Sequence, residues 1–155
     1  MLKKKCLIVR RYAYIGDLLM MTPSLRKLSE SCLIDIALPK YHEVFFNLPY
    51  INKTYFIDNL LNKNSYDIIF DLSDYEYNYE QIFSPSGILK SKIDLFVEAL
   101  KFNIFDTKLD IILSKEEIEW AENYYEKNNL KNKKTILLAI KSTSKSRDWA
   151  VESWK

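Results

Sequence analysis

Residues 6–28 restrict the fold more than any other part of the sequence, because they place an apolar strand, a short turn and a helix in succession. Residues 7–9, Leu-Ile-Val, form the continuous apolar run that is typical of a strand buried on both faces of a parallel sheet. Gly16, one of two glycines in the chain, and Asp17 follow where the turn passes into the helix. Because α/β proteins bind ligands beyond the carboxyl ends of their strands, this turn is a candidate ligand site.

Gly16 and Asp17 each have a functional and a purely structural interpretation. Gly16 can adopt backbone angles that are closed to other residues, and it lets a ligand approach the main chain closely. Asp17 lies at the first free N–H groups of the helix, where a negative charge is stabilised by about 0.3–1 kcal/mol, so it should be ionised near neutral pH. Most acids at such positions serve only the helix, so the residues alone leave the role of Asp17 open.

Composition limits the class of protein. A chain of 155 residues with 48% hydrophobic and 28% charged residues is long enough for one globular domain with a buried core. The net charge of +2 and the scattered basic residues argue against nucleic-acid binding, which needs a clustered basic face. The apolar run after Lys3–Lys5 is interrupted at once by arginines, so we expect a cytoplasmic protein without a signal peptide or membrane span.

Strand-like and helix-like segments alternate along the chain, which predicts a doubly wound parallel α/β sheet. After the first strand, the expected strands span residues 33–38, 53–57, 66–72, 109–113 and 135–140. The expected helices begin at Asp17, with a kink or second start at Thr22-Pro23, and cover residues 41–47, 90–103, 114–129 and 150–155. Residues 73–89 are polar and rich in tyrosine, and we expect a loop there.

Several other residues have both a purely structural and a functional interpretation. Tyr75, Tyr77 and Tyr79 alternate as one face of an extended segment would, either in a packed loop or as a platform for a sugar. His42 has no nucleophile or metal-ligand partner nearby in sequence, which favours a structural role. The two cysteines, at positions 6 and 32, are not at metal-ligand spacing, so we expect reduced structural thiols and no metal.

The loop of residues 141–148 combines hydroxyl groups with cations directly after an expected strand. Ser142, Thr143 and Arg147 have the chemistry of a phosphate site, although a solvated loop is an equally good interpretation. The loop contains no glycine, so it is not a P-loop. The sequence ends within the expected helix of residues 150–155, which predicts a truncated chain or a fragment of a longer one.

Three blocks resemble glycosyltransferase family 9, the bacterial ADP-heptose:lipopolysaccharide heptosyltransferases. Ile8 to Leu25 is similar to the family's first strand and helix, with a turn of small residues, Gly-Asp, two apolar residues and Thr-Pro-x-Leu. Tyr66 to Leu72 is similar to its next recognisable segment. Ser142 to Trp154 looks like its nucleotide-phosphate loop. The first block is the most specific of the three.

The resemblance implies a GT-B fold of two Rossmann-like domains, the first for the acceptor and the second for a nucleotide sugar. Residues 1–133 would form the acceptor-side domain, and residues 134–155 the first strand and phosphate loop of the second domain. The implied reaction is inverting transfer of heptose from ADP-heptose to a lipopolysaccharide-core or related lipid-linked acceptor. The reaction needs no metal or cofactor. The implied location of the protein is the cytoplasm, with peripheral contact at the inner membrane surface.

The resemblance also implies roles for single residues. In the family the Asp after the turn glycine is the base, which is Asp17 by position. Arg10, Arg11, Tyr14 and Gly16 would form the acceptor-side turn, where the two arginines are either acceptor-phosphate contacts or exposed strand-end residues. Ser142, Thr143 and Arg147 would bind the donor phosphates. The family usually has Lys at position 147 and Pro at position 150, so Arg147 keeps the charge and changes the geometry.

Two other classes of function were weighed against the transferase. A truncated, non-catalytic Rossmann-like module would keep the acceptor-side fold and bind a sugar or a protein partner. A chain without most of the donor domain is expected to have little transferase activity by itself. A dinucleotide oxidoreductase is disfavoured, because the first turn lacks the G-x-G-x-x-G glycines that let the backbone reach a pyrophosphate.

Overall fold

The computed structural model describes residues 3–12, 14–59, 63–83 and 90–136. The chain divides into two compact units, Met1–Leu113 and Ser114–Lys155, which are described separately below. The boundary expected at residue 133 stays a prediction, because the strand and loop that would open a second domain fall mostly at residues 137–155, outside the described residues.

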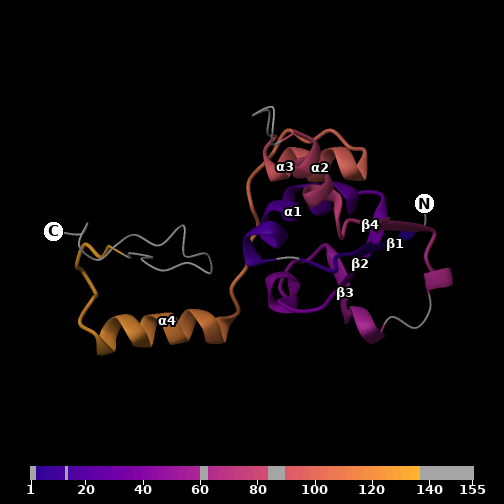
Figure 1. Ribbon diagram of the computed structural model, residues 1–155. Helices are drawn as coiled ribbons and strands as arrows, with labels where there is room; N and C mark the ends of the chain where they lie inside the picture. The colour runs from indigo at the N-terminus through magenta and orange to yellow at the C-terminus, as the bar shows by residue number, and fades with distance from the viewer. Residues whose placement is uncertain (1–2, 13, 60–62, 84–89, 137–155) are drawn as a thin grey trace. The chain divides into compact units, whose positions relative to one another are not determined.

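The first unit is built on a four-stranded parallel sheet with the strand order β3-β2-β1-β4 (Figure 1). The strands are β1 (Lys4–Val9), β2 (Cys32–Leu38), β3 (Ile51–Phe56) and β4 (Ile68–Asp71). In register, Val9 of β1 lies between Ala37 of β2 and Asp71 of β4, so these strands end close together. The structure confirms the parallel α/β sheet expected from the alternation of elements.

The order of the strands creates a switch point beside β1. The chain passes from β1 outward to β2 and β3, and then returns to the other side of β1 to form β4. The segments that follow β1 and β4 therefore leave the carboxyl ends of neighbouring strands in different directions. This is the position at which open α/β sheets bind their ligands.

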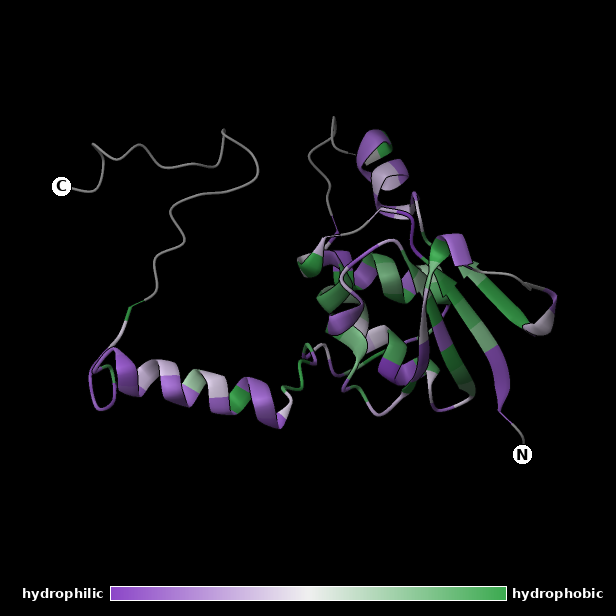
Figure 2. Ribbon diagram, turned by 90° about the horizontal axis from the view of Figure 1, so that it is seen from below, coloured by the Kyte–Doolittle hydropathy of each residue, from purple (hydrophilic) through white to green (hydrophobic). Residues whose placement is uncertain are grey.

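The core lies on both faces of β1, as its apolar run predicts. Leu7 and Ile8 are fully buried and Val9 is 1% exposed. Ile8 packs on one face with side chains of β2, of helix α1 (Ile15–Leu28), of helix α3 (Lys92–Leu100) and of the short 3-10 helix η1 (His42–Phe45). Leu7 and Val9 pack on the other face with Ala37, Ile57 and Tyr66. Figure 2 shows the apolar residues concentrated along the strands and on the helix that faces them.

Both cysteines are buried free thiols. Burial, with smaller contributions from Cys32 and Asp35, raises the pKa of Cys6 to about 12. The thiol is therefore protonated and unreactive near neutral pH, as expected of a structural cysteine.

Helix α1 continues through Pro23, although the sequence predicted a kink or a second start there. Proline has no N–H, so the carbonyl of Leu19 loses its usual partner four residues on. The Thr22 hydroxyl donates to this carbonyl at 2.7 Å and satisfies it instead. The Thr-Pro pair thus lets one helix run from Ile15 to Leu28.

The prediction of a loop at residues 73–89 is wrong for the first part of this segment, because residues Tyr75–Phe83 form helix α2. Few of its residues are strongly apolar, and the tyrosines at alternate positions imitate a strand. Its position depends on a distant partner, since the buried Glu76 pairs with Arg10 at the end of β1. Residues 84–89 lie outside the described residues.

Residues 109–113, expected to be a strand, are not part of the sheet. Their backbone is held by side chains: the Thr22 hydroxyl accepts from the Asp110 N–H at 2.9 Å, and Asn47 donates to the carbonyl of Ile112 at 2.9 Å. The short apolar run predicted a strand, but its polar groups find partners on other elements.

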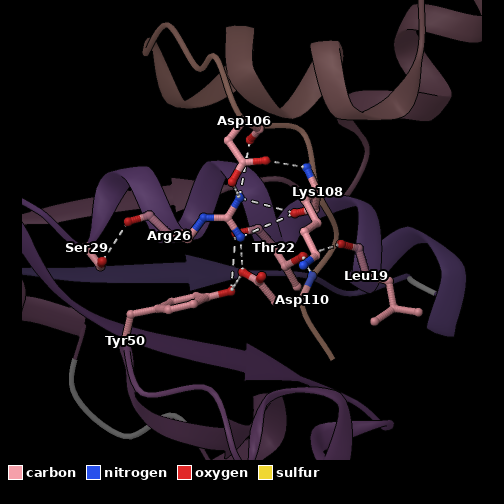
Figure 3. Close-up of polar contacts among 8 residues, drawn as sticks. All are labelled: Leu19, Thr22, Arg26, Ser29, Tyr50, Asp106, Lys108 and Asp110. Atoms are coloured by element: carbon pink, nitrogen blue, oxygen red, sulfur yellow. Dashed lines mark hydrogen bonds and ion pairs between the residues drawn. The ribbon is translucent and has the colours of Figure 1, made fainter. Parts of the chain in front are cut away.

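Arg26, near the end of α1, holds the segment that follows α3 (Figure 3). Its guanidinium pairs with Asp106 at 3.0 Å and with Asp110, and it donates to the carbonyl of Lys108. The Tyr50 hydroxyl also donates to Asp110 at 2.6 Å, and burial together with this bond raises the pKa of Tyr50. One cationic side chain thus orders a segment that has no regular structure.

The second unit contains helix α4 (Lys115–Lys127). As predicted, Ser114 begins it with a capping box: the Glu117 N–H donates to the Ser114 hydroxyl at 3.1 Å, and the Ser114 N–H donates to the Glu117 carboxylate at 2.6 Å. Of the strand expected at residues 135–140, only Thr135 and Ile136 are described, without regular structure. None of the described helices has the length and apolar character needed to span a membrane.

Candidate functional site

A cavity of about 370 Å³ lies at the switch point between the segments that follow β1 and β4. Its lining consists of aromatic and charged side chains from the β1–α1 turn, from the segment that leads into α2, from α2 itself and from the start of α3. The lining residues are Tyr12, Tyr14, Asp17, Ser73, Asp74, Glu76, Tyr77, Glu80 and Lys92. The turn that the sequence singled out therefore forms one wall of a pocket.

Asp17, one of the lining residues, makes two contacts with its carboxylate. One carboxylate oxygen, Oδ2, accepts from the backbone N–H of Tyr14 at 3.1 Å, which is the contact of an acid that caps its own helix. The other, Oδ1, accepts from the Lys92 ammonium at 2.7 Å. The side chain is 16% exposed. The structural role of Asp17 is present, and its carboxylate also borders the cavity, as a catalytic role would require.

Lys92, at the start of α3, is a site residue that the sequence did not indicate. Partial burial by itself would lower the pKa of Lys92, but the hydrogen bond and charge of Asp17, together with the charges of Glu76 and Glu80, raise it. The ammonium is therefore charged at neutral pH and balances the Asp17 carboxylate. Because the two residues are far apart in sequence, no local pattern could have predicted their pairing.

Arg10 is a core residue, so its interpretation as an exposed strand-end residue is wrong. The side chain is fully buried. Its guanidinium pairs with Glu76 at 2.6 Å, donates to the carbonyl of Leu72 and lies 5.4 Å from the ring centroid of Phe96. The positive charge is thus already balanced inside the protein, where it holds α2 against the end of the sheet. Contact with an acceptor phosphate stays a prediction.

The comparisons with known proteins agree with this geometry at the level of the fold. No model of a known protein family matches the sequence, and no curated protein matches it. Among solved structures, the crystal structure of a glycosyl transferase family 9 protein from Veillonella parvula matches with a TM-score of 0.68 and 18% sequence identity. The match covers 98% of this chain and 58% of that one. The chain has the fold of a family 9 glycosyl transferase.

The family 9 fold places the most specific sequence block, Ile8 to Leu25, on β1, the turn and α1. The chain spans 58% of the length of the family 9 structure, so what that whole protein does is carried over here only as a proposal. The predicted donor-phosphate residues Ser142, Thr143 and Arg147 lie outside the described residues, and their role stays a prediction.

The other residues of the predicted acceptor-side turn are solvent-exposed. Arg11 donates its backbone N–H to the Ser73 hydroxyl at 3.1 Å, which ties the turn after β1 to the segment after β4, and it is not among the residues that line the pocket. Tyr14 is 63% exposed, and the Lys40 ammonium lies 5.3 Å from the centroid of its ring. The structure brings Tyr14 and Asp17 to the pocket and leaves the Arg11 side chain outside its lining.

His42 is 7% exposed, and its ring lies 4.3 Å from that of Phe56, as a structural role requires. Within the described residues, no group of three His, Cys, Asp or Glu side chains is arranged to hold a metal ion.

Gly16 does not need to be glycine for the fold. It lies within α1 and not in the left-handed region, and an added Cβ would meet only the Met20 side chain, at an ordinary distance of 4.0 Å. The structure therefore does not use the backbone angles that glycine alone adopts easily. Close approach of a ligand to the main chain is the remaining functional reason for glycine at this position.

The variant Gly16→Ala separates these interpretations. Because alanine favours a helix over glycine by about 0.5–1 kcal/mol, we expect the free energy of unfolding to rise in urea denaturation followed by circular dichroism. If a ligand packs on this backbone, the same variant weakens ligand binding or turnover. Unchanged ligand binding in a stabilised variant would remove Gly16 from the site.

Proposed function

We propose that the protein is a glycosyltransferase that transfers a sugar from a nucleotide-activated donor to a saccharide acceptor. The proposal is carried by one observation: a chain with the family 9 fold has a carboxylate, Asp17, at the edge of a pocket at the switch point of its sheet. The pocket would hold the acceptor, with the donor arriving from a nucleotide-sugar site.

Asp17 would act as the base of an inverting displacement. The acceptor hydroxyl attacks the anomeric carbon of the donor sugar, and its proton passes to the Asp17 carboxylate as the new C–O bond forms. The bond from the anomeric carbon to the nucleotide diphosphate breaks on the opposite face, and the electron pair leaves with the phosphate. Lys92 would orient the Asp17 carboxylate before the attack.

The charge on the leaving diphosphate needs hydrogen-bond donors and cations. Ser142 and Thr143 would donate hydrogen bonds and Arg147 would balance the charge, without a metal or cofactor. The finer assignment follows the sequence resemblance: heptose from ADP-heptose, an acceptor related to the lipopolysaccharide core, and a cytoplasmic location with peripheral contact at the membrane.

Product stereochemistry tests this proposal. The complete protein is incubated with a set of nucleotide sugars, ADP-heptose among them, and lipid-linked saccharide acceptors, and products are identified by mass spectrometry and NMR. We expect transfer with inversion at the anomeric carbon. Retention of configuration would contradict Asp17 as the base. Absence of transfer across the set would favour the non-catalytic module.

A further inference from the structure

The pocket has more carboxylates than cations, so some of the carboxylates have no cation to balance their charge. Asp17 is paired with Lys92, and Glu76 is paired with Arg10 behind the pocket wall. Asp74 and Glu80 are exposed lining residues, and no hydrogen-bond or ion-pair partner for either side chain lies within the described part of the chain. Two carboxylates therefore remain to interact with a bound molecule.

One oxygen of a third carboxylate, that of Glu76, also lacks a hydrogen-bond partner. Only one oxygen of Glu76, Oε2, contacts Arg10; the other, Oε1, is buried and accepts no hydrogen bond from the residues described. The Glu76 side chain is 10% exposed and borders the cavity. A buried acceptor without a hydrogen bond destabilises the folded protein, and more so when it is charged. This oxygen is closed to a bound molecule, so it adds negative charge beside the pocket without being a contact for the ligand.

Exposed tyrosines complete the lining. Tyr12, Tyr14 and Tyr77 are 70%, 63% and 62% exposed, respectively. Each has a flat apolar face on which the C–H side of a sugar ring can pack, and a hydroxyl that can bond to the sugar. Aromatic faces next to free carboxylates suit a polyhydroxylated ring, whose hydroxyls donate to the carboxylates.

The same lining is unfavourable for an anion. Both cations at the pocket, Lys92 and Arg10, are already engaged by carboxylates. Lys40 lies over the rings of Tyr14 and Tyr41, and neither it nor the exposed Arg11 is among the lining residues. A phosphate or carboxylate in the pocket would meet the charges of Asp74 and Glu80, and the excess of carboxylates over cations in the lining disfavours an anionic ligand.

We propose that this pocket binds the acceptor through a sugar residue that carries no phosphate or carboxylate, and that an amino group on that sugar strengthens binding. This inference rests on the proposed function and adds the class of acceptor. Tyr77, Asp74 and Glu80, all on or beside α2, are then the residues that determine specificity.

Binding of four matched ligands tests the inference. Calorimetry on the complete protein at neutral pH and low salt compares a methyl hexoside with its 2-amino, 6-phosphate and uronate derivatives. We expect the amino sugar to bind tightest and the neutral glycoside next, with the phosphate and uronate at least about tenfold weaker than the neutral glycoside. Added salt should reduce these differences in affinity between charged and neutral ligands.

Variants test whether the preference between neutral and anionic ligands arises in this pocket. The double variant Asp74→Asn/Glu80→Gln should reduce the preference between neutral and anionic ligands to less than about threefold. Tyr77→Ala should weaken binding of all four ligands, whereas Phe46→Ala, on an exposed aromatic residue of the same unit that is not among the lining residues, should leave their binding unchanged. Circular dichroism spectra confirm that each variant is folded.

The inference is overturned if the phosphate or uronate derivative binds as tightly as the neutral glycoside, if no ligand binds, or if the double variant leaves the preference unchanged. Transfer to an anionic acceptor would then show that the proposed function still holds. A preference for non-anionic sugars without any transfer would reject the transferase and keep only the binding preference of the pocket.

Discussion

Replacing Asp17 with Asn is expected to lower turnover by at least about 100-fold, because a positioned base contributes about 10² to 10⁴ in rate. Asn can still accept the hydrogen bond from the Tyr14 N–H, so the helix end keeps its contact. It cannot take a proton from the acceptor hydroxyl, and it removes the ion-pair partner of Lys92. Steady-state kinetics should show the loss in kcat, with the affinity for the donor nearly unchanged.

Asp94→Asn is the matched control for this variant. Asp94 occupies the same position in the first turn of α3 that Asp17 occupies in α1, with its N–H bound by Ser91, and it is not among the residues that line the pocket. Both variants remove a favourable charge from a helix start, at a cost of about 0.3–1 kcal/mol, and Asp17→Asn also loses the ion pair with Lys92. Only Asp17→Asn should lose turnover. Equal turnover in the two variants would exclude Asp17 as the base.

Glu76→Leu is expected to destabilise the protein by about 3–5 kcal/mol, because it leaves the buried Arg10 charge without its partner. The double variant Arg10→Met/Glu76→Leu removes both charges and should recover most of this loss. Recovery is incomplete because the Leu72 carbonyl loses the Arg10 donor and keeps only the long contact with the Tyr75 N–H, at 3.5 Å. Urea denaturation followed by circular dichroism measures the free energy of unfolding of each variant.

The exposed pair Lys27–Glu30 provides the comparison. Its side chains are 42% and 65% exposed, so Glu30→Leu should change stability by no more than about 1 kcal/mol. If Glu76→Leu costs no more than Glu30→Leu, Arg10 is not held as a buried, charge-dependent anchor of α2. If the double variant is as unstable as Glu76→Leu, the loss comes from packing and not from the unpaired charge.

Local patterns predicted the elements whose causes are local. The apolar run of residues 7–9 predicted β1, and the pairing of Ser114 with Glu117 predicted the start of α4, because both signals act within a few residues. The same reasoning was wrong for α2 and for residues 109–113. In both places the deciding contacts come from distant residues: Arg10 for α2, and Thr22 and Arg26 for the segment after α3.

Some residues of the candidate site were likewise predictable from local sequence, and others were not. The sequence pointed to Asp17 and Tyr14, because a turn between a buried strand and a helix is recognisable locally. It gave no sign of Lys92, whose partner Asp17 precedes it by 75 residues. It also left Arg10 undecided between an exposed residue and a phosphate contact, because burial depends on what packs over the strand end.

The sequence by itself determined that this chain forms a parallel α/β sheet with a ligand-facing turn after its first strand, since strand burial and helix starts depend on neighbouring residues. Only the tertiary structure decided what faces that turn. The return of the chain to form β4 beside β1 brings α2 and the start of α3 to the same place, where carboxylates and tyrosines surround Asp17. Such a pocket depends on strand order, and strand order follows from packing across the whole sheet.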